Sequence, residues 1–189
     1  MKTAATAATL NESAGQRFEP CAVSICDAVP ADLLTWLHDP KVGGVLQHVT
    51  RSHMRSDIHR YLFASCFAQE NNYSPKLDMY PPKLQPSHKN VTAEHVPFTD
   101  RFRVQLANDP ASTVVSHIAK DGHYYIHPDP AQCRSLTVRE VARLQTFPDN
   151  YFFEGNRTEQ YAQIGNAVPP YLARQIAKVV VDFIKSARS

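Results

Sequence analysis

The 189-residue sequence predicts a mixed α/β fold, on three observations. Residues 53–69 and the residues after Pro169 place apolar side chains at helical spacing, whereas residues 101–127 hold short β-branched and aromatic runs typical of strands. The composition, with 43% hydrophobic and 20% charged residues, is that of a globular chain. The length suits one domain, or one domain with a small appendage. No apolar run approaches the roughly 20 residues that a membrane span needs.

The first 17 residues, MKTAATAATLNESAGQR, are rich in Ala, Thr and Ser and contain no apolar h-region. They predict a disordered lead-in rather than a secretory signal. The four cysteines lack the spacing of zinc ligands, so we expect reduced thiols. They are Cys21, Cys26, Cys66 and Cys133. The formal net charge of +2 neither demands nor excludes a nucleic-acid partner.

In chain order, residues 21–29 predict a short extended run, and residues 31–38 predict a helix that Pro40 ends. Residues 53–69 form the strongest central helix prediction. One face of that helix would bury Met54, Ile58, Tyr61, Leu62 and Ser65. Residues 71–100 combine several prolines with little periodicity and predict a loop.

The next region is predicted to form short strands, at residues 101–107, 112–119 and 123–127. The turn Lys120–Gly122 would join the last two strands as a hairpin. Loops with Lys, Asp and Gly are often only turns, so the turn by itself carries no function.

Two helices are predicted to follow. The first, within residues 134–147, opens with a capping box of Thr137 and Glu140 and ends before Pro148. The second begins at Pro169 or Pro170, where the missing N–H costs nothing. Its apolar stripe consists of Leu172, Ile176, Val179, Val180 and Phe183, widened by Ala173 and Ala177.

The sequence shows no motif of a self-sufficient active site. It contains no glycine-rich nucleotide loop, no HExxH zinc motif and no GxSxG nucleophile motif. His53 and His59 lie six residues apart and would not share a helix face. We therefore expect neither catalytic residues nor a metal site on these 189 residues.

Two stretches carry a specific resemblance: RSLTVREVARLQTFPD at residues 134–149 and QIGNAVPP at residues 163–170. In this order and at this spacing, they resemble the ninth and tenth motifs of DNA (cytosine-5) methyltransferases, and the likeness extends over residues 134–177. Residues 100–129 are more loosely similar to the end of the target recognition domain of that family. Residues 18–100 would supply the rest of this most variable domain.

The resemblance implies an organisation and an activity. Residues 1–17 would be the lead-in, residues 18–133 the DNA-binding recognition domain, and residues 134–189 a helical segment that completes a Rossmann-like methyltransferase domain. The family transfers a methyl group from S-adenosylmethionine to C5 of cytosine in double-stranded DNA, after flipping the base out of the duplex. The implied partners are DNA and a catalytic methyltransferase subunit or upstream domain, with no membrane.

The departures from the family pattern concern its catalytic motifs. The F-x-G-x-G cofactor loop, the E-N-V acid and the Q-x-R-x-R motif do not occur, and Pro20-Cys21 lacks the context of the family nucleophile. Covalent catalysis needs both the nucleophile and the cofactor pocket. We therefore expect no activity without a catalytic half. A split enzyme, a catalytically dead DNA-binding module, a truncated remnant and a longer protein all remain open at this point.

The resemblance also assigns residue roles. It implies that Gly165, Asn166 and Ala167 border the cofactor; taken alone, the turn would be a helix entry with Asn166 as N-cap. DNA-contact candidates surround the predicted hairpin, where hydroxyl and cationic groups suit phosphate. They are Arg101, Arg103, Thr113, Ser116, His117, Lys120, Asp121 and His123. The residues expected to form structural ion pairs and caps are Arg134, Thr137, Arg139, Glu140 and Arg143.

Residues 41–61 are basic, with Lys41, Arg51, Arg55 and Arg60 against Asp57 alone. This pattern is consistent with a solvated face and also with a surface that faces phosphate. For a DNA-modifying protein we expect a cytoplasmic, nucleoid-associated location.

Overall fold

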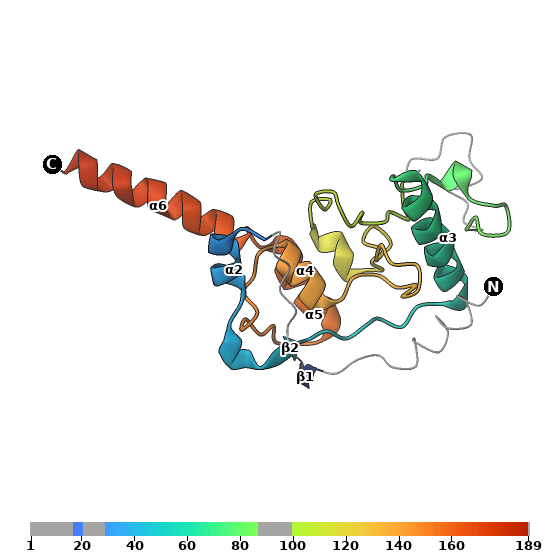
Figure 1. Ribbon diagram of the computed structural model, residues 1–189, viewed down its shortest axis with the longest axis horizontal. Coiled ribbons are helices and arrows are strands. Elements are labelled where there is room, and N and C mark those ends of the chain that lie inside the picture. Colours follow the sequence, from blue (N-terminus) through green and yellow to red (C-terminus); the bar gives the residue numbers. More distant parts are fainter. Residues whose placement is uncertain (1–16, 21–28, 87–99, 189) are drawn as a thin grey trace. The chain divides into compact units, whose positions relative to one another are not determined.

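The computed structural model describes residues 17–20, 29–86 and 100–188, so the predicted lead-in and most of the extended run at 21–29 lie outside the described residues. Figure 1 shows the described helices and strands, coloured along the sequence. The chain divides into two packing units. The first contains Val49–Thr113 and Lys120–Thr137, and the second contains Gln16–His48, Val114–Ala119 and Val138–Ser189. These are packing units, and the functional boundary expected at residue 133 stays a prediction.

The first unit is built around helix α3, Arg55–Asn71, followed by the short 3-10 helix η2, Leu77–Met79. Tyr61, Ala64 and Ala68 of α3 pack in one apolar cluster. The cluster is completed by Leu77, Tyr80, Phe102, Val104 and Ile126. The helix ends where Asn72 adopts a left-handed conformation, a usual way to terminate a helix.

The helix predicted at 53–69 is thus confirmed, but its buried face was partly wrong. Asp57, Tyr61, Ala64, Ser65 and Ala68 are the buried residues of α3. Met54 is 67% exposed because it precedes the first turn as the N-cap. Small side chains at 64, 65 and 68 let the helix approach the core closely, and a scan for large apolar residues does not detect them.

The strands predicted within 101–127 do not form as such. Residues 104, 126 and 135 meet only in isolated bridges, Val104 with Ile126 and Ile126 with Ser135. Residues Ser116–Ala119 form a 3-10 helix, η3, so the predicted strand at 112–119 and its hairpin are wrong. The burial pattern gives the reason: Val115, Ser116 and His117 are all exposed between the buried Val114 and Ile118, whereas in a strand Ser116 would lie on the same face as the two buried residues.

The second unit holds a two-stranded antiparallel sheet, in which β1, Phe18–Pro20, pairs with β2, Gly44–Leu46. The structure is therefore mixed, with most regular structure helical and this one small sheet among the described residues. Four α-helices and two 3-10 helices belong to the second unit. They are α2, Ala31–Leu37; η1, Pro40–Val42; η3; α4, Val138–Leu144; α5, Arg157–Asn166; and α6, Pro170–Ala187.

Helices α2, α4 and α6 confirm the predicted helices near 31–38, 134–147 and 170. Helix α5 is an addition: Asn156 caps it, with its side chain accepting from the Glu159 N–H at 3.1 Å while the Glu159 carboxylate accepts from the Asn156 N–H at 2.7 Å. That capping box is a local signal. Tyr161 and Ile164 bury the inner face of α5, which packs against η3. Over the described ranges, no helix combines the length and the apolarity needed to cross a membrane.

Candidate functional site

The turn QIGNAVPP joins α5 to α6. Gln163 to Asn166 form the last turn of α5, Ala167 is its C-cap, and Pro169 is the N-cap of α6. Asn166 is therefore the final residue of one helix and not the N-cap of the next, so the helix-entry interpretation with Asn166 as N-cap is wrong. Two consecutive prolines explain the corner, because neither can donate an N–H to continue α5.

Gly165 lies at the tightest contact of this corner. A Cβ placed on it would lie 2.6 Å from the backbone N of Ser116 and 2.7 Å from the carbonyl carbon of Val115. The missing side chain thus lets α5 approach η3 at backbone distance. Asn166 is exposed and Ala167 is half-buried, so both offer surface to a ligand, as do the exposed Gln163 and Val168 of the same turn.

Gln145 also stabilises the corner between α5 and α6. Its side chain is buried, and its Nε2 donates to the carbonyl of Ile164 at 3.2 Å and to that of Val114 at 3.4 Å. One amide therefore ties the end of α4 to both α5 and the segment that leads into η3. Sequence reasoning missed this role, because a lone Gln at a helix end carries no local signal.

The guanidinium of Arg139 is the most deeply buried charge of the ninth-motif helix. It donates to three backbone carbonyls: Leu46 at 2.9 Å, Pro148 at 3.2 Å and Tyr151 at 2.6 Å. Burial lowers the pKa of Arg139 to about 10. Arg139 thus connects β2 to the two turns after α4, through carbonyls and not through a carboxylate.

Arg143 makes the ion pair of this helix. Its Nε and Nη2 donate to the two carboxylate oxygens of Asp149 at 2.8 and 2.9 Å, the bidentate geometry that Arg prefers. Glu140 is half-buried in the first turn of α4, and Thr137 is buried just before it. Arg134, which belongs to the first unit, is buried and donates to the Ser135 carbonyl at 3.1 Å.

The DNA-contact candidates fall in both units. Ser116 and His117 are exposed on η3 in the second unit, while Thr113 and Lys120 are exposed in the first. The two arginines are half-buried beside carboxylates: Arg101 lies 3.7 Å from Asp121, and Arg103 lies 2.7 Å from Asp100 and 3.2 Å from the Ser112 hydroxyl. A phosphate at either arginine would compete with the existing carboxylate.

His123 is placed differently from the other candidates. It is only 8% exposed, its Nδ1 lies 2.7 Å from the Tyr61 hydroxyl, and its backbone N–H donates to Asp121 at 3.0 Å. Burial lowers the pKa of His123, so its neutral form is favoured. Asp121 thereby brings Arg101 and His123 together, and the predicted phosphate contact of His123 stays a prediction.

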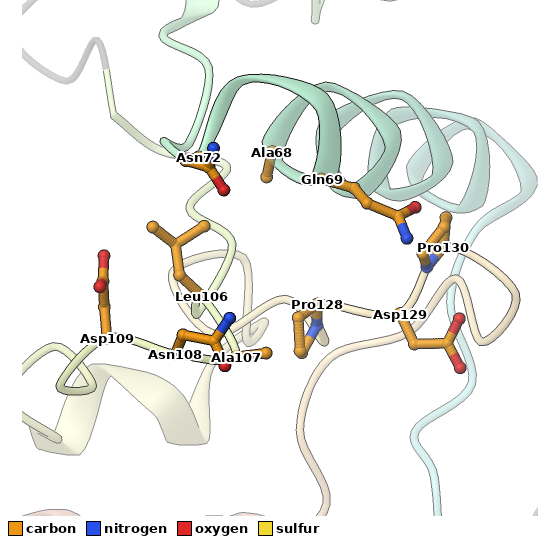
Figure 2. Close-up of a pocket in the computed structure, with 10 residues that line it drawn as sticks. All are labelled: Ala68, Gln69, Asn72, Leu106, Ala107, Asn108, Asp109, Pro128, Asp129 and Pro130. Atoms are coloured by element: carbon orange, nitrogen blue, oxygen red, sulfur yellow. The ribbon is translucent and has the colours of Figure 1, made fainter.

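The first unit also contains a hollow of about 610 Å³ (Figure 2). It lies between the end of α3 and two loops, with Gln69 and Asn72 on the helix side and Asn108, Asp109 and Asp129 on the loop side. Its ten lining residues include two carboxylates and no cationic side chain, so it lacks the charge that a phosphate requires. None of the predicted site residues lines it. Within the described ranges, no group of His, Cys, Asp or Glu side chains is arranged to hold a metal ion.

Comparison with known proteins identifies the family. The model of the C-5 cytosine-specific DNA methylase family matches residues 37–182. Type II methyltransferase M.Bpa9945I of Bacillus paralicheniformis is 49% identical over 141 residues, which are 75% of this chain and 30% of that protein. Type II methyltransferase M1.HphI of Haemophilus parahaemolyticus is 31% identical over 150 residues, which are 76% of this chain and 34% of that protein.

A shorter match reaches an archaeal protein. DNA (cytosine-5-)-methyltransferase M.ApeKI of Aeropyrum pernix is 45% identical over 75 residues, 40% of this chain and 16% of its own length. The chain thus spans about a third or less of the length of these curated relatives. The family match covers most of the chain, including the corner between α5 and α6 and the helix that contains Arg139. The chain belongs to the C-5 cytosine-specific DNA methylase family.

Proposed function

We propose that this chain is the part of a DNA (cytosine-5) methyltransferase that recognises DNA and completes the catalytic domain. The whole enzyme would transfer a methyl group from S-adenosylmethionine to C5 of cytosine in DNA. The observation that carries the proposal is the uncovered apolar face of α6. This face would dock onto the Rossmann-like catalytic portion of the enzyme and complete it.

The face follows a single stripe along the helix. Leu172, Ile176, Val179 and Phe183 are 46%, 53%, 69% and 72% exposed, and they are spaced so that all four lie on one side. Lys178 and Lys185 lie in the opposite half of the helix. Burying one large apolar side chain contributes about 1.5–3 kcal/mol, so the stripe could supply several kcal/mol to docking. Exposed apolar patches of this kind mark interaction surfaces.

A catalytic methyltransferase portion is the occupant that fits this face. The curated relatives have about two thirds of their length outside the region that matches this chain. The F-x-G-x-G loop and the E-N-V motif of the family do not occur among residues 1–189, and Pro20-Cys21 lacks the context of the family nucleophile. These residues by themselves would then bind DNA without methylating it, until the catalytic portion is supplied.

The corner before α6 fits the role of one wall of the cofactor site. Enzymes of the family use S-adenosylmethionine, which supplies the methyl group. Asn166 is exposed with an amide that can donate and accept hydrogen bonds, and Ala167 is small and half-buried. Both would be carried to the catalytic portion when α6 docks. Gly165 would act through packing, since Ser116 occupies the space beside it.

DNA would be met by the exposed polar and cationic side chains around residues 113–120. Thr113, Ser116 and His117 present hydroxyl and imidazole groups, and Lys120 presents a full positive charge. Such groups suit contacts to phosphate oxygens. The half-buried Arg101 and Arg103 would add to the positive potential, although Asp121 and Asp100 partly neutralise it.

The test is a chimera of M.Bpa9945I in which residues 29–188 of this chain replace the matching region. We expect transfer of radioactive methyl groups from S-adenosylmethionine to DNA. The double variant Val179→Glu/Phe183→Glu should abolish transfer, because two charges would be placed in the docked face. Lys178→Glu, on the opposite face, is the matched control and should stay active.

Two outcomes would contradict the proposal. An active double variant would show that the apolar face of α6 does not dock. DNA binding by the chimera without any methyl transfer would favour the alternative, a catalytically dead DNA-binding module.

A further inference from the structure

Helix α6 leaves the second unit from a single anchored turn. All residues from Leu172 to Arg188 are exposed, so the contacts that fix the direction of the helix lie near its start, at Tyr171 and Arg174. Figure 1 shows α2 beside the first turn of α6 and the remainder of α6 extending beyond it. Whatever determines the direction of α6 must therefore act at the first turn.

We propose that Thr146, Trp36 and Asp32 form a clamp that fixes the direction of α6, and that α2 is thereby a positioning element for the docking helix. The inference rests on the proposed function, since a fixed direction matters only if α6 docks. It concerns the orientation of the apolar face of α6, and not which side chains form that face.

The first half of the clamp is Thr146. Its hydroxyl accepts the backbone N–H of Tyr171 at 3.1 Å. Pro169 and Pro170 have no N–H, so Tyr171 has the first N–H of α6, and the N-cap has no side chain that could accept it. Thr146, 25 positions earlier in the sequence, therefore replaces a missing cap.

The backbone of Thr146 is strained. Its φ is +60°, in the left-handed region that favours glycine and that a β-branched residue rarely adopts. The position follows α4, where Gln145 and Phe147 donate to the Val141 and Ala142 carbonyls, and a glycine is usual at such a helix end. Such backbone strain persists only where surrounding contacts impose it. The hydroxyl contact to Tyr171 is such a contact.

The second half of the clamp comes from α2. Trp36 Nε1 donates to the Thr146 carbonyl at 2.8 Å, and the Trp36 and Tyr171 rings lie 5.9 Å apart. The Tyr171 hydroxyl donates to the Asp32 carboxylate, and this hydrogen bond lowers the pKa of Asp32. The Arg174 guanidinium lies 5.2 Å above the Trp36 ring. Two positions of α6 one turn apart are thus held by the same short helix.

Because α6 is long, a small change of direction at its first turn moves its far end by a large distance. Eighteen helical residues extend about 27 Å at 1.5 Å per residue, so a 10° error at the first turn displaces the far end by about 5 Å. Apolar side chains are in contact only within about 4–4.5 Å. A loosened first turn would therefore misplace Val179 and Phe183 and leave the apolar stripe unpaired. Asp32 and Trp36 also precede residue 37, where the family match begins, so this half of the clamp comes from outside the matched residues.

The variant Thr146→Gly distinguishes a loss of the clamp from a general loss of folding stability. Glycine relieves the strained φ and removes the hydroxyl, whereas Thr146→Ser keeps the hydroxyl as a matched control. In the full chain we expect the unfolding midpoint of Thr146→Gly to equal or exceed that of the wild type. Residual dipolar couplings of the α6 amides, compared with those of the rest of the second unit, should fall by at least half in Thr146→Gly and in Trp36→Phe, but not in Thr146→Ser.

The chimera supplies the functional readout. Thr146→Gly should raise KM for S-adenosylmethionine about tenfold, as expected for a displaced wall of its site, with less change in kcat. Unchanged α6 couplings in Thr146→Gly would overturn the clamp. Reduced couplings with unchanged KM would overturn its positioning role. An inactive chimera with wild-type clamp residues would count against the proposed function alone, because the couplings of the full chain decide the clamp independently.

Discussion

Replacing Arg139 by methionine tests how the ninth-motif helix stabilises the second unit. The three hydrogen bonds that Arg139 donates to carbonyls are charge-assisted, and each contributes about 1.5–3 kcal/mol, roughly 4.5–9 kcal/mol together. Burial opposes this gain, since the lowering of the pKa of Arg139 to about 10 corresponds to roughly 3 kcal/mol against the charged form. The balance predicts that Arg139→Met lowers the free energy of unfolding by about 3 kcal/mol.

Urea denaturation followed by tryptophan fluorescence measures this loss. The chain has a single tryptophan, Trp36, and it lies in the same unit as Arg139, so its signal reports on that unit. With a slope of about 1–3 kcal/mol per molar urea, the midpoint should fall by roughly 1–3 M. Arg143→Met is the control: the side chain of Arg143 is 39% exposed, so we expect a loss below about 1 kcal/mol. Equal losses in both variants would refute the reasoning from burial.

Three further predictions concern other residues. His53 Nε2 accepts the Ser135 N–H at 3.2 Å, and burial lowers the pKa of His53 to about 4. The folded state therefore disfavours protonation of His53, so the free energy of unfolding of the first unit should be highest above pH 6.5. Toward pH 4 it should fall by up to about 1.4 kcal/mol per pH unit. Denaturation at pH 5 and pH 7.5 checks this, and His53→Gln should flatten the dependence. Gly165→Ala should gain about 1 kcal/mol of helix propensity but lose about 1–3 kcal/mol to the clash with Ser116, so a higher Tm in thermal unfolding would contradict the close packing. Lys120→Ala should reduce the salt slope of DNA binding, measured by fluorescence anisotropy, by about one, and an unchanged slope would remove Lys120 from the interface.

The helices could be predicted because their signals are local. Pro40 and Pro148 follow the ends of α2 and α4 by three and four residues, and Pro170 is the first residue of α6. The capping box of Asn156 and Glu159 is equally local and would have predicted α5. The strand predictions were wrong because strand pairing is not local. Pairing of Val104 with Ile126 depends on residues 22 positions apart, and a run of β-branched residues indicates suitability for a strand without indicating a partner.

In the candidate site, too, contacts between distant segments could not be predicted from the sequence. The resemblance implied that Gly165 borders the cofactor, and it did not predict the close packing of Gly165 on Ser116, which lies in a segment that was expected to be a strand. His123 looked like a surface residue of a hairpin, whereas the contact with Tyr61 places it in the core. Thr146 carries no sequence signal at all, because its role depends on a φ of +60° and on the approach of Tyr171.

By itself, the sequence determined the family, the helices α2, α3, α4 and α6, and the corner that starts α6 at Pro170. Each of these depends on residues within a few positions of one another, where caps, prolines and motif spacing act directly. Only the tertiary structure decided that Trp36 bonds to Thr146 across 110 positions, that Arg139 reaches Leu46 across 93, and that the stripe of α6 stays uncovered. Such contacts form when distant segments pack into one core, and the closure of those long loops is set by the whole fold and not by any local pattern.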